Sequence, residues 1–83
     1  MFLSLEEKFL LDHLSEVCQL PEEEMISYLN TFYYPLDPAI HVCEQKGNLL
    51  AKAILEERAG YIDGSFRSYE RLIRNAIYSG KYT

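Results

Sequence analysis

Two short segments of the chain end in the same way, with a few polar or charged residues followed by a single glycine. The first is Glu44-Gln45-Lys46-Gly47 and the second is Glu57-Arg58-Ala59-Gly60. Glycine is the usual residue just past a helix C-terminus, because it adopts the left-handed backbone conformation without a Cβ penalty. The two glycines stand thirteen positions apart, which leaves room for one helix of about three turns. Short helices joined through repeated glycine corners favour a stack of helical hairpins, an α-solenoid.

The first third of the chain predicts two helices. Ser4 and Glu7 match a capping box, and apolar residues then recur at helical spacing, so a first helix is expected over about 5–19. Pro21 suits the first turn of a second helix, and the three glutamates that follow complement the positive end of its dipole. This second helix is expected to bury Met25 and Leu29. Its other apolar candidates are Ile26, Tyr28 and Phe32.

The rest of the chain predicts three more helices. Pro35 and Pro38 cannot stand inside one continuing helix, so a break is expected there, followed by a short third helix that ends at Gly47. A fourth helix is expected over about 49–59 and a fifth over about 64–79. The residues predicted to cap the helices are Ser4, Asp37, Gly47, Asn48, Gly60, Asp63 and Gly80.

No alternating strand pattern of useful length occurs, so the predicted fold class is all-α, with about five short antiparallel helices. We expect one helical-repeat segment over 1–83. Within it, 1–34 forms a first helical hairpin, 35–60 a second hairpin and 61–83 a last helix.

Charge is unevenly distributed along the chain. The net charge of −5 argues against nucleic acid as a main partner, because phosphate contact requires a basic face. Acidic residues gather in the first third. In the last helix, Arg67, Arg71 and Arg74 are spaced to form one stripe opposite the apolar side. The apolar side consists of Phe66, Tyr69, Ile73, Ala76 and Ile77. The arginine stripe is the candidate partner-binding surface, for an acidic partner or a lipid headgroup. A solvated face that complements the helix dipole is the alternative.

No pattern points to catalysis or to a bound metal. His13 with Cys18, and His41 with Cys43, lack the paired spacings of zinc sites. Both cysteines are expected to be reduced, small apolar fillers, and a disulfide between them stays open. The chain lacks a nucleophile elbow and a glycine-rich phosphate loop. We therefore predict a protein that is not an enzyme and that has no cofactor.

Three consecutive segments resemble one repeat of the clathrin-heavy-chain type. They are Cys43-Glu44-Gln45-Lys46-Gly47, then 51–60 with the sequence AKAILEERAG, then Ile62-Asp63-Gly64-Ser65-Phe66. Such repeats occur in clathrin and in the vacuolar-protein-sorting tethering subunits of the HOPS and CORVET complexes. The resemblance covers about 20–75, and Ser65 stands where alanine is more usual. It implies an α-solenoid fragment of a longer protein.

The resemblance implies a protein–protein interaction scaffold, a helical-repeat segment of a membrane-trafficking tether or coat subunit. Its partners would be neighbouring repeats, other subunits or a second copy of the chain. Its location would be cytoplasmic, with peripheral association on endosomal or vesicle membranes only through a complex. The alternative is a stand-alone small helical bundle that binds and regulates another protein, for example a phage or bacterial inhibitor. We expect a continuing array to leave apolar ends open at Phe2-Leu3-Leu5 and at Ile77-Tyr78-Tyr82, whereas a stand-alone bundle would close them.

Overall fold

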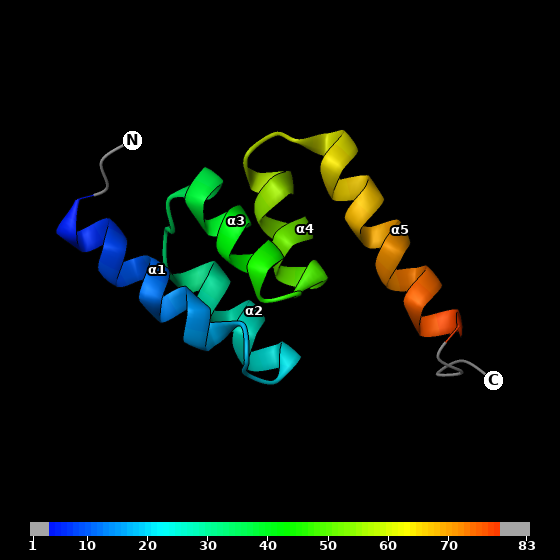
Figure 1. The fold of residues 1–83 in the computed structure, drawn as a ribbon, viewed down its shortest axis with the longest axis horizontal. Coiled ribbons are helices and arrows are strands. Elements are labelled where there is room, and N and C mark those ends of the chain that lie inside the picture. Colours follow the sequence, from blue (N-terminus) through cyan, green and yellow to red (C-terminus); the bar gives the residue numbers. More distant parts are fainter. Residues whose placement is uncertain (1–3, 79–83) are drawn as a thin grey trace.

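Helices make up all the regular secondary structure of the computed structural model, which describes residues 4–78 (Figure 1). The prediction of an all-α chain is therefore confirmed for this part of the sequence. In chain order the helices are α1 (Leu5–Val17), α2 (Glu22–Thr31), α3 (Leu36–Gln45), α4 (Leu49–Arg58) and α5 (Ile62–Tyr78).

The helices are arranged along an elongated body that measures 46 × 26 × 20 Å. Figure 1 shows α1 and α5 at opposite ends of the long axis, with α3 and α4 between them. Helix α4 packs against α3 on one side and against α5 on the other. Within residues 4–78, α5 packs closely against α4 alone. The last helix therefore has one covered side and a large free surface.

The apolar core lies among α1 to α4. Residues from all four helices and from the α2–α3 connection form one buried cluster, and the predicted Met25 and Leu29 belong to it. Helix α5 contributes no buried residue to this cluster. The buried members are Leu14, Val17, Met25, Leu29, Tyr34, Ala39, Cys43, Ala51 and Leu55.

The two glycine corners have the same geometry. Gly47 and Gly60 have φ values of 69° and 84°, in the left-handed region that disfavours a side chain. At the first corner, the Asn48 N–H donates to the Cys43 carbonyl at 2.9 Å, which closes a turn of six residues. At the second, the Tyr61 N–H donates to the Glu56 carbonyl at 2.8 Å in the same pattern. Both corners are Schellman motifs, so the repeated sequence produces a repeated turn.

Two of the predicted caps are wrong. Helix α3 begins at Leu36 with Pro35 at its N-cap, so Asp37 lies in the first turn. Its carboxylate is not used as a cap and accepts a hydrogen bond from the Tyr61 hydroxyl at 2.7 Å. Helix α5 begins at Ile62, because the Schellman motif leads directly into a new helix, and Asp63 lies in its first turn. Gly80 lies outside the described residues.

The two other predicted N-caps, Ser4 and Asn48, accept backbone hydrogen bonds through their side chains. The Ser4 hydroxyl accepts from the Glu7 N–H at 3.1 Å, and the Glu7 carboxylate accepts from the Ser4 N–H at 3.1 Å. The Asn48 Oδ1 accepts from the Ala51 N–H at 3.0 Å. Each such contact satisfies a donor that the first turn of a helix leaves without an intrahelical partner.

Replacing Gly60 tests the second corner. We expect Gly60→Val to lower the free energy of unfolding by about 1–2 kcal/mol, because a β-branched residue is strained in the left-handed region. A Cβ at this position meets no atom within 4 Å, so the loss reflects backbone conformation and not a clash. Urea denaturation measures it. Gly60→Asn is the matched control and should lose less, since asparagine tolerates this conformation. Equal losses for the two variants would contradict the explanation.

Candidate protein-interaction surface

Small and polar residues form the side of α5 that faces α4. The Ser65 hydroxyl donates to the Ala53 carbonyl at 3.0 Å, and the Ser68 hydroxyl donates to the Glu56 carboxylate at 2.7 Å. Ser65, Ser68 and Glu56 are all buried. Gly64 completes this face, because a Cβ there would lie 2.4 Å from the Glu56 Oε2 atom. Close approach and hydrogen bonds therefore both contribute to the docking of α5 on α4.

Two tyrosines border the same contact. The Tyr69 hydroxyl lies 3.5 Å from a carboxylate oxygen of Glu57. Burial, together with that carboxylate, raises the pKa of Tyr69. At the corner before α5, the hydrogen bond to the Asp37 carboxylate raises the pKa of Tyr61. Both hydroxyls therefore stay protonated at neutral pH and act as donors to these acids.

Four large apolar side chains of α5 point away from α4 into solvent. Ile62, Phe66, Ile73 and Ile77 are 62%, 72%, 60% and 58% exposed. Their spacing of four, seven and four residues places them on one side of a helix with 3.6 residues per turn. We call these four residues the outer apolar stripe. This row of exposed apolar residues makes α5 a candidate interaction surface.

The structure divides the apolar side predicted for α5. The sequence groups Phe66, Tyr69, Ile73, Ala76 and Ile77 together, but Tyr69 and Ala76 are partly buried whereas the other three are exposed. The signal for the inner face was the set of small residues Gly64, Ser65 and Ser68, which recur at helical spacing. Small residues permit close helix approach, so this spacing indicates a face that packs on another helix.

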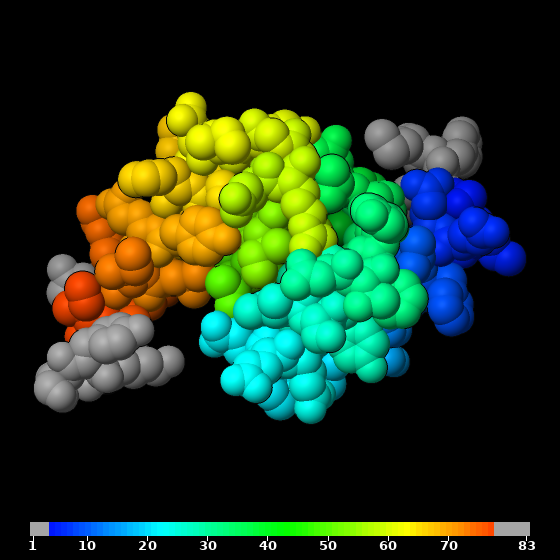
Figure 2. All heavy atoms as spheres, turned by 180° about the vertical axis from the view of Figure 1, so that it is seen from behind, coloured from blue at the N-terminus to red at the C-terminus, as the bar shows by residue number. Residues whose placement is uncertain are grey.

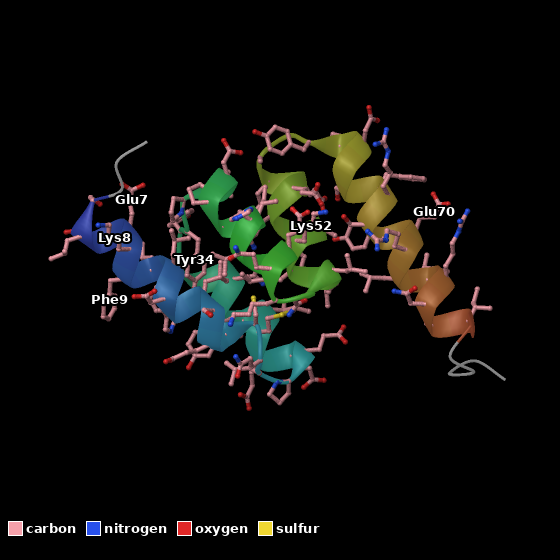
Figure 3. All side chains as sticks on the ribbon, viewed as in Figure 1. Glu7, Lys8, Phe9, Tyr34, Lys52 and Glu70 are labelled. Carbon is pink, nitrogen blue, oxygen red and sulfur yellow. The ribbon has the colours of Figure 1, made fainter. Side chains whose placement is uncertain are left out.

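The three arginines of the candidate stripe are all exposed. Arg74 forms an ion pair with Glu70 of the same helix at 2.6 Å. Figure 3 shows Glu70 projecting from α5 on the side away from α4. Arg71 lines a cavity of about 350 Å³ at the α3–α4 corner, beside Glu44 and Lys52. Arg67 lies one turn before Arg71 on the same helix. The arginine stripe is accessible, and its role in binding a partner stays a prediction.

A second apolar area lies at the opposite end of the molecule. Leu5 and Phe9, one turn apart on α1, are 85% and 74% exposed. Figure 3 shows the Phe9 side chain projecting away from the body of the protein. Glu6 and Glu7 lie beside them, so this end is apolar and acidic.

A histidine surrounded by aromatic rings joins α1 to α2 and to the segment before α3. The His13 ring contacts Tyr28 and Phe32 edge-on, with centroids 5.4 and 5.2 Å away. Its Nδ1 atom lies 2.9 Å from the Tyr34 hydroxyl, and burial raises the pKa of Tyr34. Sequence reasoning missed this cluster, because its members are distant in the chain and carry no common motif. Its contacts are those of a packing element.

No known family model, curated protein or solved structure matches this chain. Among the described residues, no three metal-ligating side chains gather at one place. Within the same residues, no helix is long and apolar enough to cross a membrane.

The polar contact beneath α5 can be tested by Ser68→Ala. This variant removes the donor to a buried carboxylate, so we expect a loss of about 1–3 kcal/mol in the free energy of unfolding. Hydrogen exchange should rise in the amides of α5 more than in those of α1. Arg74→Ala is the control, because it breaks an exposed ion pair on the same helix and should leave stability nearly unchanged. Equal effects of the two variants would contradict a role for the buried pair.

Proposed function

We propose that this chain is a protein–protein interaction scaffold, a helical-repeat segment of a membrane-trafficking tether or coat subunit. The outer apolar stripe carries the proposal. Its occupant is an amphipathic helical hairpin, the next unit of the same kind of array. The protein would act as a structural support, because stacked hairpins form a rod whose free faces bind further helices.

The packing of α4 supports this occupant. Helix α4 is covered by α3 on one side and by α5 on the other, and both connections are Schellman corners. In a helical array each internal helix is covered in this way. Helix α5 is covered on one side only, and its outer apolar stripe lies where the following helix would pack. The exposed Leu5 and Phe9 leave the other end open in the same manner.

The trafficking assignment depends on the clathrin-heavy-chain-type resemblance, and the geometry supports only its architectural part. The two sequence segments that end in glycine each form a helix C-terminus with the same left-handed turn. The arginines beside the stripe would add charge pairing with an acidic partner surface. That contribution is weaker than apolar burial because salt screens exposed charges.

Self-association of the isolated chain tests the proposal, because a free stripe binds another apolar helix face when its proper neighbour is absent. We expect light scattering over a concentration series to show an apparent mass that rises with concentration. Phe66→Ser should raise the apparent dissociation constant by about tenfold or more, from the lost apolar burial.

Tyr33→Ser is the matched control for this experiment. Tyr33 is an aromatic residue that is 95% exposed in the connection between α2 and α3, away from α5. We expect it to leave the association unchanged. A native chain that stays monomeric at every concentration would contradict the scaffold and favour the stand-alone regulator. An equal effect of both variants would show that the contact does not involve the stripe.

A further inference from the structure

Two cysteines from separate helices meet in the core. The Sγ atoms of Cys18, at the C-cap of α1, and Cys43, in α3, lie 3.8 Å apart, with one thiol donating to the other. Both are free thiols in this structure. A disulfide requires about 2.05 Å between the sulfurs, so the two atoms must approach further before a bond can form.

One residue, Asn48, bonds the backbones of both cysteines. The Asn48 Nδ2 atom donates to the Cys18 carbonyl at 2.9 Å, and the Asn48 backbone N–H donates to the Cys43 carbonyl at 2.9 Å. Asn48 also caps α4 through its Oδ1 atom. The cysteines are therefore fixed at two points, independently of their own thiol contact.

The two thiols differ in access. Cys43 is fully buried, whereas Cys18 is half-buried and lines a cavity of about 780 Å³ together with Glu22, Lys46 and Leu72. Figure 2 shows a hollow on this part of the surface, between the C-terminal half of α5 and the start of α2. A small reagent can therefore approach Cys18 but not Cys43.

The electrostatic surroundings also favour reaction at Cys18 before reaction at Cys43. The hydrogen bond from Cys43 lowers the pKa of the Cys18 thiol, and although burial opposes this, the Lys46 charge reinforces it. The hydrogen bond with Cys18 and burial both raise the pKa of Cys43. Cys18 is accordingly the thiolate that attacks first, since the thiolate is the nucleophile in such exchange.

We propose that Cys18 and Cys43 form a thiol–disulfide exchange site that closes reversibly on reaction with a low-molecular-weight disulfide. Oxidised glutathione is a reagent of this class. The Cys18 thiolate attacks one glutathione sulfur, the glutathione S–S bond breaks and one glutathione thiolate leaves. The Cys43 sulfur then attacks the Cys18 sulfur, and the second glutathione leaves. The two protein thiols lose two protons and two electrons, and one glutathione disulfide becomes two glutathione thiols.

The second step is favoured by position, because Cys43 already touches the sulfur that it attacks. The product would join the end of α1 to α3 and close a loop that contains α2, between residues 25 positions apart. This restriction of the unfolded chain stabilises the folded one. The inference is independent of the proposed scaffold function, because neither cysteine lies on the outer apolar stripe.

The experiment treats the full chain with oxidised glutathione, quenches it with acid and measures mass and free thiols. We expect a monomer that has lost two hydrogen atoms and both alkylatable thiols, and that dithiothreitol restores. Its thermal midpoint should exceed that of the reduced chain by roughly 10 °C. A product that keeps one glutathione, a cross-link between chains or an unchanged midpoint would overturn the proposal.

Two variants separate the steps. In Cys18→Ser, we expect Cys43 to stay reduced and to react slowly with an alkylating agent. Rapid attachment of glutathione to Cys43 in this variant would overturn the assigned order. Asn48→Asp keeps the acceptor that caps α4 but loses the donor to the Cys18 carbonyl. It should slow the closing step several-fold while the first attachment proceeds at the native rate, and an unchanged closing rate would overturn the positioning role of Asn48.

Discussion

The left-handed glycine at each end of α4 is the constraint on which the arrangement of the second half of the molecule depends. Gly47 and Gly60 both end a helix with the Schellman hydrogen bonds and start the next one within one or two residues. These corners limit α4 to ten residues and turn the chain back on itself twice. Helix α4 is consequently covered on two sides, and its alanines at 51 and 53 are fully buried.

The orientation of α5 follows from polar contacts and not from its apolar pattern. Periodicity along the sequence groups the apolar residues of this helix, but it carries no information about which of them face a neighbour. The decisive contacts join Ser65 and Ser68 to Ala53 and Glu56 across twelve positions in each case. Pairings at that distance involve two helices at once, so single-helix patterns could not have revealed them.

Local signals predicted the local structure well. The caps at Ser4 and Asn48 are read directly from residue type, because each side chain bonds within three positions of itself. Residue type does not predict the other contacts of Asn48, because its Nδ2 atom contacts Cys18 and the Met25 sulfur, 30 and 23 positions away. Similarly, Asp37 was predicted to cap a helix because it stands before a proline. Its carboxylate instead accepts a hydrogen bond from the Tyr61 hydroxyl.

The inner and outer faces of α5 together determine how strongly this helix is held. Its contact with α4 buries two serines and a glutamate, and each of their hydrogen bonds contributes only modestly to stability. The outer apolar stripe stays exposed to water. A helix that packed on this stripe would bury it and add to the stability of α5. Under the proposed scaffold function, binding of a partner to this end would therefore also stabilise the docking of α5.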